Sequence, residues 1–366
     1  METEPPQDAA APVATSQPKK SDPAAQARQE KLRRQFQRAL GSHVFGEVKD
    51  ADTRALLSDF RMAEAIALTQ KRAATGASDA LALLSQMHET CRWRNWDGAK
   101  RTRAQGDEAA ASARANAATL PAELQENIEV ALEVERQAID AWLDACADTQ
   151  FDGAWIERQL RDRAEAGDEV SLRALADMSV TRPEDRLRLL RSAALLGNRD
   201  AVVDVASALH QEVTHDNNLA HLEEMKQWLD AAAKISPHGK YLLGDCLLKG
   251  CGGLAPEVER GLALLREAAR QGDGFALKEL ADVITAPTGS FTGEEQYAWL
   301  TFEARMRDTG CGGPANYVVG RIDNWQRLQS MERGLSPYAL AKGKLMGEQY
   351  WNAYGTQALA GCGRGS

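Results

Sequence analysis

Apolar side chains recur at steps of three and four residues over most of the chain, and this spacing places them on one face of a helix. It predicts helices over residues 24–40, 51–72, 78–91, 98–118 and 121–147. Strand-forming residues are sparse beside Ala, Leu, Arg and Glu, which also favours helix. Residues 1–23 differ, because proline, alanine and polar residues replace the pattern there. Such a stretch buries too little surface to offset its ordering entropy, so we expect a disordered tail.

A repeated pattern begins near Trp155 and is anchored on four positions, Gly167, Gly197, Ile235 and Gly272. Alanine stands three residues before each anchor, and a large apolar residue stands seven before it. A small residue stands four positions after each anchor, and an apolar residue stands eight after it. Agreement at so many positions in four copies indicates an internal repeat.

The spacing of this repeat predicts a helical hairpin in each copy. Positions −7 and −3 lie one turn apart on a helix that ends near the anchor, and positions +4 and +8 belong to the next helix. Glycine at three anchors supplies the left-handed residue that ends a helix. Hairpins of this kind bury their faces only against neighbouring copies, so they stack into a solenoid with an extended concave surface. The sequence therefore predicts an all-α fold: an α/α superhelical repeat solenoid over 155–310, after an antiparallel helical region over 24–150 and before a helical cap over 311–366.

The stretch over residues 241–282 resembles a SEL-one-like repeat, a relative of the tetratricopeptide repeat. The leucine–glycine pair of that family, its two loop glycines and its closing Ala-Ala-x-x-Gly fall on Leu243 and Gly244, on Gly250 and Gly253, and on residues 268–272. The resemblance covers about residues 155–310. It implies an α/α superhelix that binds another protein, mostly in bacterial envelope or signalling settings, and it implies no chemistry.

A polar stripe occupies the positions six and ten residues after each anchor, written +6 and +10, on the helix that follows the anchor. Its members are Arg173 and Asp177, Val203 and Ser207, Tyr241 and Asp245, and Lys278 and Asp282. These are i,i+4 neighbours, so one interpretation is ordinary intrahelical pairing worth a few tenths of a kcal/mol. The other is a polar binding groove on the concave face, in which Tyr241 is the aromatic anchor.

The six cysteines are even in number and form no CxxC pair. Three disulfides are candidates: Cys91–Cys146 at helix ends that lie together in an up-down-up arrangement, Cys246–Cys251 across a short loop, and Cys311–Cys362 near the C-terminus. Disulfides would indicate an oxidising compartment, so we expect the mature form of a periplasmic or envelope-associated protein. Buried free thiols are the alternative, and they would return the protein to the cytoplasm.

The formal net charge of −9 disfavours nucleic acid as a partner, because phosphate binding needs a basic face. No apolar run is long enough to span a bilayer. His210, His215 and His221 share no helix face, so we expect no metal site and no cofactor. Hydrolase, zinc-protease and phosphate-loop motifs are absent from the sequence. We therefore expect a non-catalytic protein-interaction scaffold, an envelope adaptor or an immunity-type inhibitor. The alternative is an enzyme or enzyme regulator with its site in the N-terminal helices.

Overall fold

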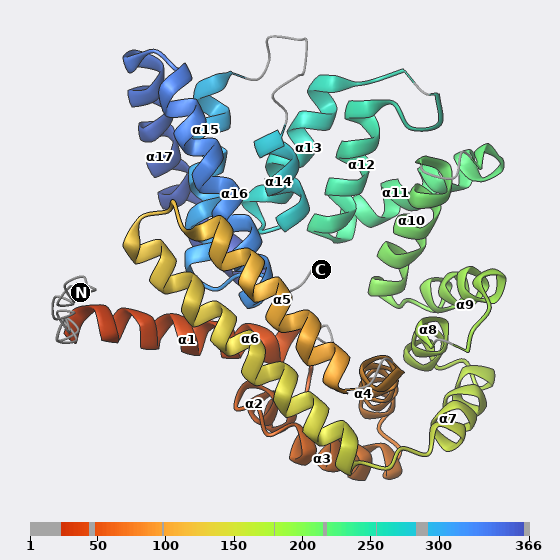
Figure 1. The fold of residues 1–366 in the computed structure, drawn as a ribbon. Coiled ribbons are helices and arrows are strands. Elements are labelled where there is room, and N and C mark those ends of the chain that lie inside the picture. Colours follow the sequence, from red (N-terminus) through yellow and green to blue (C-terminus); the bar gives the residue numbers. More distant parts are fainter. Residues whose placement is uncertain are drawn as a thin grey trace, which may run out of the picture.

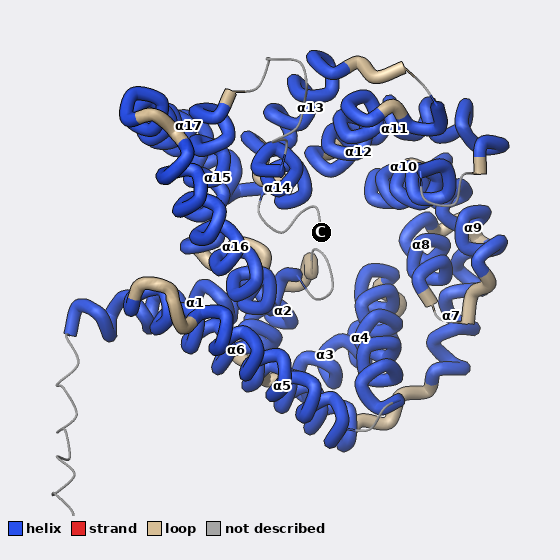
Figure 2. Tube along the Cα trace, turned by 45° about the horizontal axis from the view of Figure 1, so that its top comes forward, coloured by secondary structure: helices blue, strands red, loops and turns tan. Residues whose placement is uncertain are grey.

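The computed structural model describes residues 23–43, 48–96, 99–178, 180–214, 218–253, 255–282 and 292–361. These ranges contain helices and turns and no strand (Figure 2). The N-terminal helices are α1 (Pro23–His43), α2 (Ala51–Ser58), α3 (Met62–Ala74), α4 (Ser78–Trp96), α5 (Ala99–Ala117) and α6 (Ala122–Asp148). The next eight are α7 (Gly153–Glu165), α8 (Glu169–Asp177), α9 (Pro183–Leu195), α10 (Arg199–Thr214), α11 (Leu222–Ile235), α12 (Pro237–Lys249), α13 (Val258–Arg270) and α14 (Gly274–Asp282). The last three are α15 (Gly293–Asp308), α16 (Gly313–Gly334) and α17 (Pro337–Gly361). The predicted all-α repeat fold is confirmed.

The four predicted repeat units are the hairpins α7–α8, α9–α10, α11–α12 and α13–α14. Gly167, Gly197 and Gly272 take φ values of +86°, +99° and +89° between their helices, which is the left-handed conformation expected of them. The residue after each anchor caps the second helix, because its side chain accepts a hydrogen bond from a backbone N–H of that helix. These four caps are Asp168, Asn198, Ser236 and Asp273. Each hairpin is therefore defined by an anchor and the cap beside it.

The single helix predicted over 51–72 is wrong, because the chain turns between α2 and α3. Phe60 takes a φ of +59°, and backbone hydrogen bonds from Phe60 N to Leu57 O and from Arg61 N to Leu56 O close the turn. No glycine marks this turn in the sequence. The turn brings residues of both helices, Leu57 of α2 and Met62 of α3, into one buried cluster, which stabilises it.

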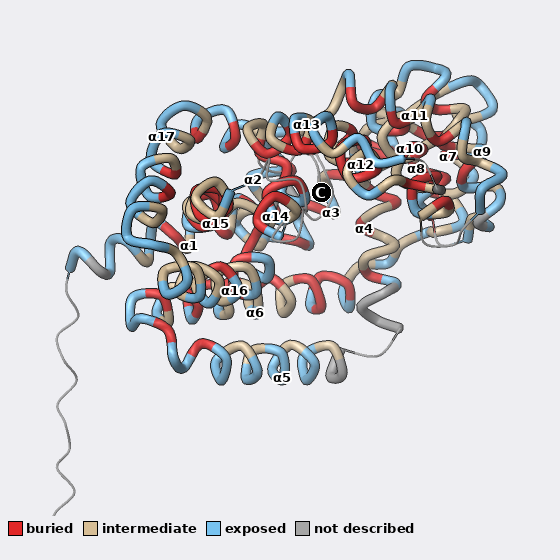
Figure 3. The backbone as a smooth tube through the Cα atoms, turned by 90° about the horizontal axis from the view of Figure 1, so that it is seen from above, coloured by how far each residue is buried: buried red, intermediate tan, exposed pale blue. Residues whose placement is uncertain are grey.

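A further hairpin, α3–α4, precedes the four predicted ones. Gly76 joins its helices with a φ of +98°. Ala73 stands three residues before Gly76, and Ala80 and Leu84 stand four and eight after it, as in the repeat. Helix α4 packs directly against α7 and α8, so this hairpin stacks on the first predicted unit. Helices α5 and α6 are an insertion between them, and α5 lies mostly exposed at the outer edge (Figure 3).

The stacked hairpins of the solenoid curve until its two ends meet, and this closes the array into a ring (Figures 1 and 2). Helix α16 packs against α1 and α6 and so joins the C-terminal part of the array to the N-terminal helices. We call this three-helix contact the seam. Its core contains Phe36 of α1, Ile128 of α6 and Tyr317 of α16, and the rings of Phe36 and Tyr317 meet edge to face at 5.0 Å.

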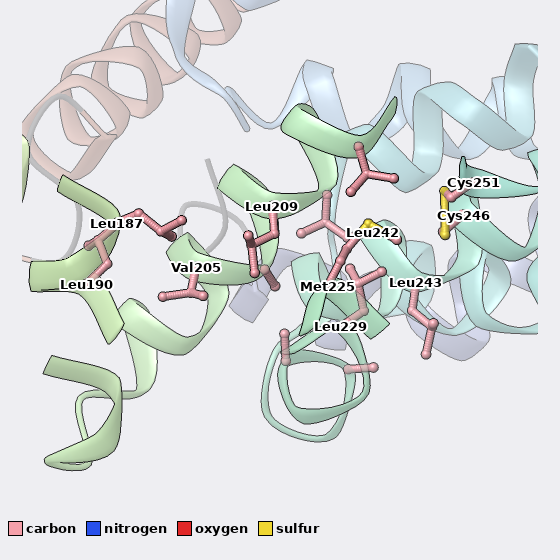
Figure 4. Close-up of a cluster of buried hydrophobic side chains, with 14 of the residues drawn as sticks. Leu187, Leu190, Val205, Leu209, Met225, Leu229, Leu242, Leu243, Cys246 and Cys251 are labelled. Carbon is pink, nitrogen blue, oxygen red and sulfur yellow. A yellow bond between two sulfur atoms is a disulfide. The ribbon is translucent and has the colours of Figure 1, made fainter. Parts of the chain in front are cut away.

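Two of the three predicted disulfides are confirmed. Cys91 of α4 is bonded to Cys146 of α6 with 5.2 Å between their Cα atoms, so the bond ties the inserted pair to the array. Cys246 is bonded to Cys251 at the end of α12, next to the buried leucines of α11 and α12 (Figure 4). Cys362 lies outside the described residues, so the Cys311–Cys362 bond stays a prediction.

Candidate binding site in the hollow of the ring

The ring encloses a cavity of ≈ 1300 Å³, which we call the hollow. Helices α3, α4, α8 and α10 form much of its wall. The first residues of α2, α12 and α14 and the last residues of α17 complete it. A Cβ on Gly272, at the α13–α14 turn, would contact the backbone of Ala358, so α17 lies close against this turn. Segments from both halves of the chain therefore line one space.

The predicted polar stripe divides into two sets in the structure. The stripe residues of the first two units, Arg173, Asp177, Val203 and Ser207, line the hollow. Those of the last two units, Tyr241, Asp245, Lys278 and Asp282, are not among its lining residues. The stripe residues of α8 and α10 therefore face the hollow, as a groove on the concave face requires, whereas those of α12 and α14 do not.

Arg173 connects two neighbouring hairpins instead of pairing within its own helix. Its Nε donates a 2.7 Å hydrogen bond to Asp204 Oδ2 of α10, and its Nη1 lies 3.4 Å from Asp200 Oδ2. Asp177 pairs with Arg186 of α9 at 3.6 Å. The intrahelical pairing considered for Arg173 and Asp177 is therefore replaced by contacts between α8, α9 and α10.

The carboxylates of this cluster are only partly neutralised. The pKa of Asp177 lies above its usual value, because the surrounding protein desolvates the carboxylate and because Asp204 adds like charge. Arg173 and Arg186 oppose this rise through their positive charge. Asp200 extends into solvent with 75% of its side chain exposed. Three carboxylates therefore share this wall of the hollow with Arg173 and Arg199, and Asp200 is the carboxylate most open to solvent.

The wall formed by α3 and α4 has the same character. Arg72 lies 2.5 Å from Asp50 Oδ1 and 3.5 Å from Asp79 Oδ2, so two carboxylates share one guanidinium. Among the described residues, neither carboxylate oxygen of Glu89 has a hydrogen-bond partner, and its nearest ion-pair contact is His88 Nδ1 at 3.7 Å. Glu89 is largely buried beside the hollow, and a buried carboxylate without hydrogen bonds is costly.

Three aromatic rings cluster at the start of α12 and α14, and two of them interrupt the polar lining of the hollow. The ring centroid of His238 lies 5.4 Å from that of Tyr241 and 5.2 Å from that of Phe275, and the rings of Tyr241 and Phe275 stack at 5.5 Å. His238 and Phe275 line the hollow, and Phe275 is 48% exposed. Asp273 Oδ2 lies 3.2 Å from His238 Nδ1 while Oδ1 caps α14, which fixes the position of the ring. We call these three rings the aromatic shelf.

The remaining predicted site residues make structural contacts. Asp245 is buried, and its Oδ2 lies 3.6 Å from His210 Nε2. Lys278 and Asp282 form the intrahelical pair considered in the sequence, with 2.5 Å between Nζ and Oδ2. Asp282 also bonds Arg327 of α16 at 2.6 Å, so it links α14 to the C-terminal helices.

The contribution of the α3–α4 hairpin to the hollow was not predicted from the sequence. Arg72, Asp79 and Glu89 all belong to this hairpin. The repeat pattern around Gly76 could have revealed it, but Thr69 stands where the other units have a large apolar residue. His238 and Phe275 were missed because they precede the +6 positions of their helices.

Among the described residues, no helix is long and apolar enough to cross a membrane. The same residues contain no group of three or more His, Cys, Asp or Glu side chains placed to hold a metal ion.

The chain matches no protein-family model and no curated protein. Among solved structures it is similar to c5321, described as a protective antigen present in uropathogenic Escherichia coli strains displaying an SLR fold. The two share 16% sequence identity with a TM-score of 0.47, over 88% of this chain and 70% of that one.

Proposed function

We propose that this chain is a non-catalytic interaction scaffold that holds a segment of a partner protein in the hollow of its ring. The observation that carries the proposal is the convergence of polar inner-face residues from separate hairpins on one cavity, including Arg173, Asp177 and Ser207. Stacked helical repeats commonly use such concave surfaces to bind other proteins.

The size of the hollow supports a polypeptide as its occupant. Small-molecule pockets occupy about 300–1,000 Å³, and the hollow exceeds this range at ≈ 1300 Å³. A helix with its side chains is about 10–12 Å across and rises about 1.5 Å per residue, so the hollow has room for about two to three helical turns. An extended segment would fit equally in volume.

The setting we propose is the bacterial envelope, where the protein would act as an adaptor or as an immunity-type inhibitor. The two disulfides support an oxidising compartment, and the SEL-one-like resemblance of residues 241–282 supports the envelope. Titration of thiols in the denatured, unreduced protein from its native cell tests this setting. Six free thiols would place the protein in a reducing compartment instead.

Site-specific photo-cross-linking tests the binding site. A photoreactive amino acid at Ser207 would face the hollow, and one at Asp230, exposed on α11 and away from the hollow, is the matched control. We expect partner adducts from position 207 and not from position 230, identified by mass spectrometry after irradiation in the native cell. Adducts from position 230 alone would move the binding surface to the outside of the ring.

A further inference from the structure

We infer that the segment bound in the hollow is cationic, with lysine or arginine side chains placed beside an apolar residue. This inference rests on the proposed function and specifies the chemistry of the partner. It follows from the charges of the wall, from how those charges are paired, and from the aromatic shelf.

Carboxylates outnumber cations on the wall of the hollow. Its acids are Asp50, Asp79, Glu89, Asp177, Asp200 and Asp204, and its basic residues are Lys49, Arg72, Arg173 and Arg199. A cleft lined by an excess of one charge focuses its field and raises the local concentration of the opposite charge. The hollow therefore attracts cations and repels anionic segments.

The existing cations are largely engaged with the protein itself. Arg72 is held between two carboxylates, and Arg173 likewise contacts both Asp200 and Asp204. Arg199 donates to the carbonyl oxygen of Ile235 at 3.1 Å. In the described part of the chain Lys49 has no ion-pair partner, but one lysine does not balance the excess. A bound cation would reach Asp200 most easily, because 75% of its side chain is exposed and its contact with Arg173 is as long as 3.4 Å.

The aromatic shelf supplies an independent feature of the same site. Phe275 exposes nearly half of its surface to the hollow, contacts the tilted ring of His238 there, and stacks on Tyr241 behind it. Aromatic faces attract lysine and arginine and also bury apolar side chains. Acidic residues on α8 and α10 and rings on α12 and α14 thus lie along one wall, which suits a segment that alternates basic and apolar residues.

Peptide binding to the intact protein tests the inference. The probe is a fluorescein-labelled peptide of about ten residues, the length estimated for the hollow, composed of lysine, leucine and alanine. A matched peptide carries glutamine in place of every lysine. Fluorescence anisotropy should show at least about tenfold tighter binding of the lysine peptide at low salt, and the difference should shrink as salt screens the charges.

Two variants and two controls locate the binding. Asp200→Asn should weaken the lysine peptide about threefold to tenfold, and Phe275→Ala about tenfold. Asp230→Asn and Tyr338→Ala are the matched controls, because both residues are exposed and neither lines the hollow. Circular dichroism and urea unfolding establish that each variant is folded before binding is compared.

Equal affinity for the two peptides, no binding of either, or no effect of Asp200→Asn would each overturn the inference. The proposed function has its own readout in the photo-cross-linking at Ser207. If that residue captures a partner through a segment without lysine or arginine, the hollow is still the binding site and only the cationic partner is wrong. If the partner is captured only at position 230, both proposals fail.

Discussion

Replacing Gly310 by alanine should weaken the seam that closes the ring. Gly310 lies between α15 and α16 with a φ of +80°. A Cβ at this position would lie 2.9 Å from Gln35 Cβ and 3.2 Å from the Gln35 carbonyl carbon, both on α1. The Gln35 carbonyl carbon belongs to the backbone and cannot rotate away. The turn at Gly310 and helix α1 must therefore move apart to relieve this contact.

The expected magnitude separates into two parts. A non-glycine residue in the left-handed region costs about 1–2 kcal/mol. Overpacking a close contact costs about 1–3 kcal/mol more. Gly313→Ala is the matched control, because Gly313 has a φ of +79° but a Cβ there would meet no atom within 4 Å. Gly313→Ala should therefore show the conformational cost alone, and Gly310→Ala should show both costs.

Urea unfolding measures the difference in free energy between these two variants, and hydrogen exchange locates it. In Gly310→Ala the exchange rate of the α1 amides should rise by a larger factor than that of the α8 and α10 amides, which are remote from the seam. Equal destabilisation by both substitutions, or the same rise in exchange rate at α1 as at α8 and α10, would show that the seam does not depend on this close approach.

The remaining predictions concern single contacts. Arg173→Ala should lower the free energy of unfolding by about 1 kcal/mol, because it removes the link from α8 to α10. Lys278→Ala should lower it by under about 0.5 kcal/mol, because the pair of Lys278 with Asp282 is exposed. Urea unfolding compares the two variants. Replacing Cys91 and Cys146 together by serine should cost about 4 kcal/mol, from the loop-closure entropy of 55 residues, measured by urea unfolding against the parent under non-reducing conditions. The pKa of Asp177 is raised in the folded protein, so its ionisation lowers stability as the pH rises above the usual aspartate pKa of about 3.9 and through the folded pKa. Asp177→Asn should therefore unfold at higher urea than the parent at neutral pH, and this advantage should shrink toward about pH 4; an unchanged advantage across that range would contradict the assignment.

The sequence predicted the hairpins because their determinants are local. An alanine three residues before the anchor and a glycine at the anchor specify a helix end without reference to the rest of the chain. The turn at Phe60 escaped prediction because no glycine or proline marks it, and it is the packing of Leu57 and Met62 in one cluster that stabilises it.

Ring closure could not be read from the sequence. Phe36, Ile128 and Tyr317 each look like members of ordinary amphipathic helices, and nothing local indicates that they meet in one core. The contact of Arg173 with Asp204 was missed for a related reason, because i,i+4 spacing suggests a partner on the same helix while the solenoid offers one on the next hairpin. Predicting the candidate site required the curvature of the array, and curvature is the sum of small angles between many hairpins.

The seam also changes how this molecule should unfold. In an open repeat array the terminal units have one neighbour each, so they fray first and stability behaves as a linear chain of nearest-neighbour terms. Because α16 packs on α1 and α6, each end of the array gains a second neighbour. The nearest-neighbour interfaces then form a closed circle with no free end. Opening the ring anywhere then breaks one interface without freeing a unit, and releasing a unit requires a second break. Cooperative unfolding of the whole array is the consequence, in a class of proteins whose repeats otherwise melt progressively from their ends.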